Sequence, residues 1–348
     1  MPLVMDRDRI PRHWAAKKYL RPVESLGTSG ASADCLRVAL IINMPDPALE
    51  DTEAQFFELL DTAAIKTPLH LTLYSLPNIP RGERARQHLS RSYSDLKDLL
   101  NRRFDGVVMT GTEPRQPNLQ EEPYWSYLAE VLDWAEENTG STVLSCLAAH
   151  AGVLHGDGIR RNRLPDKRFG VFSHKKVCDH PMTSGASDLI PIPHSRWNDL
   201  PEGDLISSGY TILTKSAEAG VDLFAKKKKK STFIHFQGHP EYGARTLLKE
   251  YRRDVKRFLR HERETYPSMP YGYFDAAATK ALTRFREAAV ADPREERMAA
   301  FPDDAVFEAL EKTWHSVAMC LYSNWLQLIT PVRADTPAFA AMARSGDR

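Results

Sequence analysis

"STVLSCLAAHAG", residues 141–152, is the stretch that decides the fold prediction. Ser141–Ser145 suit a strand, and the small residues after Cys146 suit a helix. A sharp turn between the two exposes the thiol above the edge of a sheet and points free backbone N–H groups at the same space. The helix N-terminus favours a thiolate, and the amide of Leu147 can hold an oxyanion. The stretch therefore predicts a nucleophile, although a lone cysteine is more often a small buried hydrophobe.

Strand-like and helix-like patterns alternate on both sides of this stretch. Four segments have the apolar content of buried strands: 36–43, 68–76, 104–111 and 231–238. The clearest amphipathic helix spans 121–139. This alternation predicts an α/β fold with a mostly parallel sheet flanked by helices.

The chain divides into three parts by pattern. Residues 1–34 end in small polar residues and predict an irregular N-terminal extension. Residues 35–265 carry the alternating strands and helices, with a β-rich excursion between 153 and 235. Residues 266–348 predict a helical C-terminal extension that packs against the main domain or against a second subunit.

Composition argues against several classes of protein. A formal net charge of +1 over 348 residues disfavours a protein whose main task is nucleic-acid binding. No apolar run is long enough to predict a membrane span. Four cysteines without a C-x-x-C pair predict neither a disulfide framework nor a zinc ribbon, and they favour a reducing cytoplasm. His174, His180 and His194 are scattered and no H-E-x-x-H occurs, so we expect no metal site.

A base for the thiol is available in "FIHFQGHPEYGA", residues 233–244. An apolar strand ends here at Gly238, and His239 and Glu241 follow. Because the carboxyl ends of parallel strands meet at one edge of a sheet, His239 and Cys146 are expected to lie close together. Together with Glu241 they form a Cys/His/Glu set suited to nucleophilic catalysis. The alternative is a surface turn with exposed polar residues.

Several motifs in one order resemble a known family. They are "INMP…TEAQF", "FDGVVMTG", "YW…L…WA", "C-L-A-A-x-A-G", "P-D-K-x-F-G-V-F", "PHSR" and "GHPEY…TL…EYRRD", from about Val38 to Phe258. The chain resembles the MetA-type homoserine O-acyltransferases of methionine biosynthesis, which have a flavodoxin-like fold of the class I glutamine-amidotransferase type. The resemblance implies an acyl-CoA co-substrate, no permanently bound cofactor and a homodimer.

The resemblance also assigns roles to the three residues of the set. Cys146 matches the acylated nucleophile, His239 the general base and Glu241 the group that orients it. The family chemistry has two steps. The thiolate takes the acyl group from acyl-CoA, and the hydroxyl of an amino acid then accepts it while the base removes its proton.

Five further positions match family residues that bind substrate. Glu250 and Arg253 match the family residues that bind homoserine. The Glu250 carboxylate can pair with the ammonium of homoserine, and the Arg253 guanidinium can pair with its carboxylate. Ser195 and Arg196 match the same pocket, and Lys167 matches a residue near the acyl-CoA. A structural surface pair is the alternative for the first two, and a solvated loop charge is the alternative for Lys167.

Two departures from the family pattern bear on mechanism. Family members carry a lysine after "MP" that helps stabilise the oxyanion, whereas this chain reads "MPDPALEDTE", two residues longer and without lysine. The oxyanion hole then depends on the N–H of Leu147 and on a second donor that the sequence does not identify. His150 stands where the family often has glutamine.

The acyl donor is predicted from one further position. Five residues past Thr110, family members that use succinyl-CoA carry glycine and those that use acetyl-CoA carry glutamate, but this chain carries Arg115. An arginine can pair bidentately with the free carboxylate of a succinyl group, whereas an acetyl group offers it no partner. Succinyl-CoA is therefore favoured. Alternatively, Arg115 points into solvent or pairs with Glu113.

The leading hypothesis is a homoserine O-succinyltransferase that works through an acyl-cysteine. An alternative keeps the mechanism but uses acetyl-CoA or another hydroxy amino acid. A different class, the glutaminase subunit of an amidotransferase, shares the fold and the catalytic set, although "PHSR" and "EYRRD" argue against it. The third class is a binding scaffold without activity.

Overall fold

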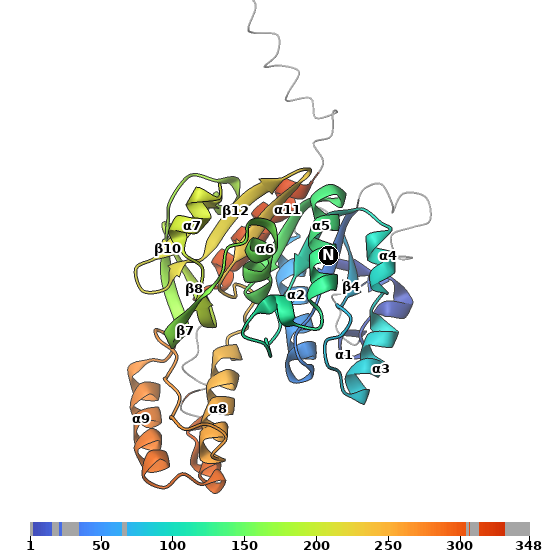
Figure 1. The fold of residues 1–348 in the computed structure, drawn as a ribbon. Helices are drawn as coiled ribbons and strands as arrows, with labels where there is room; N and C mark the ends of the chain where they lie inside the picture. Colours follow the sequence, from blue (N-terminus) through green and yellow to red (C-terminus); the bar gives the residue numbers. More distant parts are fainter. Residues whose placement is uncertain are drawn as a thin grey trace, which may run out of the picture.

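A mostly parallel sheet forms the centre of the computed structural model, which describes residues 3–15, 21–22, 35–64, 68–303, 306 and 313–330 (Figure 1). In these residues nine strands follow the order β2-β1-β4-β3-β5-β6-β13-β12-β9. Pairing is parallel from β2 to β13 and antiparallel from β13 to β9. The strands are β1 Leu3–Met5, β2 Arg21–Pro22, β3 Leu36–Ile41, β4 Leu69–Tyr74, β5 Phe104–Met109, β6 Thr139–Ser145, β9 Thr211–Ile212, β12 Leu223–Lys228 and β13 Ser231–Phe236.

A second, antiparallel sheet stands beside the first and corresponds to the predicted β-rich excursion. Its described strands have the order β11-β10-β7-β8. They are β7 Asn162–Lys176, β8 Leu189–Asp199, β10 Thr214–Ser216 and β11 Gly220–Val221. The pair β7–β8 is the longest, and a register shift between Arg163 and Arg168 bends it at the end that faces the nucleophile's cavity.

Helices cover both faces of the main sheet, which confirms the predicted α/β class (Figure 1). The helices are α1 Arg12–Ala15, α2 Asp46–Ala63, α3 Glu83–Ser92, α4 Leu96–Leu100, α5 Trp125–Asn138, α6 Leu147–Asp157, α7 Glu202–Ser207, α8 Thr246–Leu259, α9 Ala276–Ala291 and α11 His315–Ile329. Strand β3 shows why two layers form: Val38 and Leu40 pack with α2 and α11, whereas Ala39 and Ile41 pack with α5 and α6. Of the described helices, none is both long and apolar enough to cross a membrane.

Helix α11 lies directly on the main sheet. The buried Trp325 donates its indole N–H to the Ser141 hydroxyl at 3.1 Å. Gly106 provides the space, because a Cβ there would lie 2.6 Å from the Trp325 ring. Helices α8 and α9 instead project together from the lower edge of the body in Figure 1.

Three elements differ from their sequence-based expectations. The N-terminal part was expected to be irregular, but the buried apolar Leu3–Met5 pair with β4 as a strand. Helix α2 begins at Asp46 instead of near Thr52, because Pro45 and Pro47 are compatible with a first helical turn. Helix α3 was not expected, because it is very polar and buries little.

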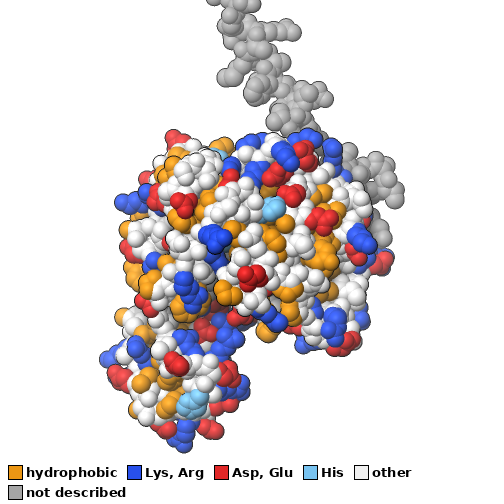
Figure 2. Space-filling model, in the orientation of Figure 1, with side chains coloured by type: hydrophobic (Ala, Val, Ile, Leu, Met, Phe, Trp, Pro, Cys, Tyr) orange, Lys and Arg blue, Asp and Glu red, His pale blue; other side chains and the backbone are white. Residues whose placement is uncertain are grey.

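On the face seen in Figure 2, acidic and basic side chains are interspersed.

Candidate active site

The nucleophile candidate Cys146 sits at a sharp elbow between β6 and α6. Its φ of 52° and ψ of −110° are unusual for a residue with a Cβ, and such strain is typical of a side chain held up at a strand-to-helix turn. The Cys146 N–H donates to the Phe236 carbonyl at 2.7 Å, which ties the elbow to β13. The thiol opens into a cavity of about 340 Å³.

His239 lies in the same cavity, on the turn after β13, as the strand order predicted. Its Nδ1 is 2.8 Å from Glu241 Oε1, so the carboxylate fixes the ring, and the Tyr242 ring stacks on it at 4.2 Å. Burial opposes protonation of His239, but the negative charges of Cys146 and Glu241 outweigh it and hold the histidine pKa well above its usual value. The arrangement therefore favours the protonated imidazolium form of His239 beside Cys146 and Glu241.

The first turn of α6 supplies the expected backbone donor. The Leu147 N–H begins the helix beside Gly111, and a Cβ on that glycine would lie 2.8 Å from the Leu147 nitrogen. Met44, Pro45 and Ala48 line the cavity where the family pattern has its lysine. The N-terminal turn of α2 thus fills that position with apolar atoms and carries no cation there.

Glu250 on α8 is the centre of the predicted substrate site. Its carboxylate accepts hydrogen bonds from the Ser195 hydroxyl at 2.5 Å and the Tyr242 hydroxyl at 2.8 Å, and it pairs with Lys167 at 3.2 Å. Burial alone would raise the pKa of Glu250, but the Lys167 charge and these two hydrogen bonds outweigh burial and lower it. The structure therefore brings Ser195, Lys167 and Glu250 into one ionised cluster that lines the nucleophile's cavity.

The two arginines of the predicted site differ in their availability. Arg253 lines the cavity with a side chain that is 49% exposed, and it pairs with Asp254 at 3.0 Å. Arg196 is buried, and its guanidinium donates to the carbonyls of Asn198 and Ala219 and to His194 Nδ1. Because these bonds occupy most of its donors, Arg196 holds the wall of the cavity together.

The structure does not place Arg115 in the cavity that contains Cys146. The Arg115 side chain is exposed and lines a neighbouring hollow, while its backbone N–H donates to the Glu122 carboxylate at 2.5 Å. The structure therefore matches the alternative in which the Arg115 side chain is exposed to solvent, and the pairing of Arg115 with a donor carboxylate stays a prediction. Glu122 is buried, and its hydrogen bonds to the loop fix the backbone so that the Arg115 side chain faces outward.

The sequence reasoning missed several cavity-lining residues, among them Arg161, Arg163, Trp197 and Tyr242. Arg161, Arg163 and Trp197 lie on β7, β8 or the loop before them, and Tyr242 is part of the quoted "GHPEY" motif. Tyr242 could have been found, because it directly follows the His239–Glu241 pair. The other three carry no local signal, because the pairing of β7 with β8 brings Arg163 and Trp197 to the site and the chain turn at Gly158 brings Arg161 there.

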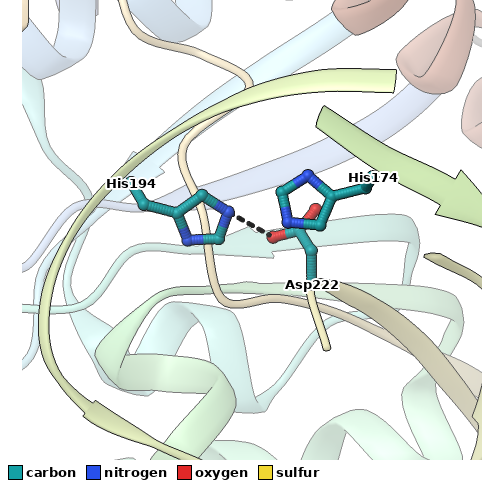
Figure 3. Close-up of side chains that lie close together, drawn as sticks. All are labelled: His174, His194 and Asp222. Atoms are coloured by element: carbon teal, nitrogen blue, oxygen red, sulfur yellow. Dashed lines mark ion pairs between the residues drawn. The ribbon is translucent and has the colours of Figure 1, made fainter. Parts of the chain in front are cut away.

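A buried polar cluster adjoins this wall (Figure 3). The structure brings His174 and His194, which looked scattered in the sequence, together with Asp222. His174 Nδ1 donates to the Phe172 carbonyl, and Arg196 donates to His194 Nδ1 at 3.2 Å. A guanidinium only donates, so the His194 proton lies on Nε2, which faces Asp222 Oδ1 at 3.6 Å.

This proton assignment bears on metal binding. A nitrogen that carries a proton has no lone pair for a metal ion, so His194 Nε2 would have to lose its proton before it could bind one, whereas His174 Nε2 keeps its lone pair. Asp222 Oδ1 also accepts the Gly238 N–H at 2.7 Å. The cluster thereby connects β8 to the turn that carries His239.

Comparison with known proteins gives concordant matches. The sequence profile of the homoserine O-succinyltransferase family matches residues 9–335. The homoserine O-succinyltransferase of Rhodopseudomonas palustris is 43% identical over 296 residues, which cover 85% of this chain and 89% of that protein. The enzyme of the same name from Methylorubrum extorquens is also 43% identical, over 85% of this chain and 87% of that protein. Among solved structures, a glutamine amidotransferase from Methylobacillus flagellatus superposes with a TM-score of 0.49 at 13% identity, over 87% of this chain and 98% of that one.

Proposed function

This chain belongs to the homoserine O-succinyltransferase family, and we propose that it transfers the succinyl group of succinyl-CoA to the hydroxyl of L-homoserine through a thioester on Cys146. The observation that carries the proposal is the hydrogen-bonded set of His239 and Glu241 in the cavity of a strained cysteine elbow. The ionised Glu250 in the same cavity adds a site for an amino group.

In the first half-reaction, the Cys146 thiolate attacks the thioester carbon of the donor. The carbonyl oxygen becomes an oxyanion, which the Leu147 N–H stabilises. The oxyanion then collapses, the bond to the CoA sulfur breaks, and the His239 imidazolium gives its proton to the departing thiolate. The products are free CoA, an acyl-cysteine and a neutral imidazole.

In the second half-reaction, the hydroxyl of the acceptor takes the place of CoA. Neutral His239 removes the hydroxyl proton as the oxygen attacks the acyl carbon, and the Cys146 thiolate leaves. Glu250 is suited to bind the substrate ammonium and Arg253 its carboxylate, since they lie on one face of α8 and both line the cavity. Because these two steps need only acid–base and thiol chemistry, we propose that no cofactor is permanently bound. We also propose that the protein works as a homodimer in the cytoplasm.

The alternatives lead to different first products. A glutaminase would release ammonia from glutamine with the same three residues. An acetyltransferase would form an acetyl thioester.

The test is the mass of the intact protein after brief incubation with succinyl-CoA and no acceptor. We expect one succinyl adduct that disappears in Cys146→Ala, persists in Cys178→Ala, and is discharged by L-homoserine. Cys178 is the matched control because it is a half-buried thiol outside the cavity. The proposal is refuted if Cys146→Ala is still labelled, if only acetyl-CoA labels the protein, or if glutamine yields ammonia at a comparable rate.

A further inference from the structure

One half-buried cation in the cavity has no anionic partner among the described residues. Arg161 lies in the loop between α6 and β7, its side chain is half-buried, and it lines the same cavity as Cys146. Among the residues that the structure describes, none forms an ion pair or hydrogen bond with its guanidinium. The acidic groups that act on it through space are Tyr124, Cys146 and Glu122.

The other cations of the described cavity wall are either paired, used by the wall itself or exposed. Lys167 pairs with Glu250, Arg253 pairs with Asp254, and the donors of Arg196 are used by the wall itself. Arg163 is exposed and lies over the Trp197 ring at 4.4 Å. Arg161 is therefore the half-buried cation of the described wall whose guanidinium donors are all left for a ligand.

The fold fixes where Arg161 points. Helix α6 ends at Gly158, whose left-handed φ of 69° turns the chain, and the buried Ile159 then anchors the loop by its N–H bond to the Val153 carbonyl. Two residues later, Arg161 enters the cavity, while its neighbour Arg160 stays exposed. The guanidinium thus comes from the loop that follows the helix whose first turn presents the thiol.

We propose that Arg161 binds the free carboxylate of the succinyl group and thereby selects succinyl-CoA over acetyl-CoA. The inference rests on the proposed function and gives Arg161 the role that the sequence had assigned to Arg115. A guanidinium and a carboxylate match bidentately, and a half-buried pair is screened less by water than a surface pair. An acetyl group presents only a methyl to the same site, so the interaction distinguishes the two donors.

The experiment compares acylation of Cys146 by succinyl-CoA and by acetyl-CoA in Arg161→Gln, Arg161→Lys and the matched control Arg160→Gln. Release of CoA in a single turnover reports the rate for each donor. For Arg161→Gln we expect kcat/KM for succinyl-CoA to fall on the order of 10- to 100-fold, because a hydrogen bond between charged groups typically contributes a factor of this size to binding. The rate with acetyl-CoA should stay within about threefold, and Arg161→Lys should recover part of the loss because it keeps the charge without the fork.

The outcomes separate this inference from the function it rests on. Equal losses with both donors would show that Arg161 acts on the reacting thioester, on CoA or on the fold, and would overturn the proposal. Unchanged selectivity in Arg161→Gln, or the same change in Arg160→Gln, would also overturn it. If wild-type protein forms no succinyl adduct, the proposed function fails first.

Discussion

Replacing Gly111 with alanine tests whether the Leu147 N–H stabilises the oxyanion. The new Cβ would lie 2.6 Å from the Leu147 Cβ and 2.8 Å from its nitrogen, closer than such atoms approach without movement. The backbone before Gly111 cannot easily shift, because the Thr110 N–H donates to Ile41 at 2.9 Å and Asn43 bonds both Thr110 oxygens. The strain should therefore displace or cover the Leu147 N–H.

Loss of one oxyanion donor typically raises the barrier by about 2.7–4 kcal/mol, which corresponds to roughly 10²–10³ in rate. We expect a decrease of that size in the single-turnover release of CoA by Gly111→Ala, with a smaller change in donor affinity. The matched control is Gly203→Ala on α7, where a Cβ meets nothing within 4 Å and φ lies outside the left-handed range. A Gly111→Ala protein that folds normally and acylates at the wild-type rate would refute the assignment of Leu147.

Three further changes test the site and its support. Glu250→Gln should raise the KM for homoserine on the order of 10- to 100-fold while acylation by the donor is kept, because the carboxylate that pairs with the ammonium is lost; equal losses in both half-reactions would contradict this role. Trp325→Ala should lower the free energy of unfolding, measured with urea, by about 3–5 kcal/mol, because it leaves a cavity at a fully buried position between α11 and the sheet. A decrease of less than about 1 kcal/mol would show that α11 is not part of the core. His150 is buried with its pKa lowered from 6.5 to about 3, so it stays neutral in the folded chain but protonates on unfolding below pH 6.5. The free energy of unfolding should thus fall by about 2 kcal/mol from this residue between pH 7 and pH 5, and His150→Gln should remove that part of the slope.

The sheet and the elbow could be predicted because their causes are local. Strands that are buried on both faces consist of nearly continuous apolar residues, and β3, β5 and β13 each form from such a segment. The elbow could be read from Cys146 between a strand and small helical residues. Parallel pairing then implied that Cys146 and His239 share one edge, and the register confirms this, because β13 pairs with β6 up to Phe236 and Ser145.

The missed elements lack such local causes. Helix α3 is almost entirely polar and rests on the body through a narrow face that includes Ala85 and Ser92. Strand β1 is only three residues long, and its strand conformation depends on the edge that β4 offers. In both cases tertiary contacts decide a conformation that the segment's own residues leave open.

The cavity cations show why site assignment needs the fold. In the sequence, Arg115 and Arg161 are both arginines in loops next to family motifs, and their intrinsic chemistry is identical. The two arginines differ in position because the Glu122 carboxylate accepts hydrogen bonds from the backbone N–H groups of Arg115 and Gln116, and the Arg115 side chain then faces outward. The chain turn at Gly158 brings the second arginine into the cavity that Cys146 lines.

Charge pairing then decides which cation can act on a ligand. Lys167 already neutralises Glu250, so binding an anion there would leave that carboxylate without its partner, and Arg253 is the proposed binder of the acceptor's carboxylate. Arg161 has no such bond to lose among the described residues. A carboxylate that enters beside Cys146 therefore gains most by pairing with Arg161. The sequence motif identifies the thiol, whereas the distribution of paired and unpaired charges around it determines which acyl group the thiol receives.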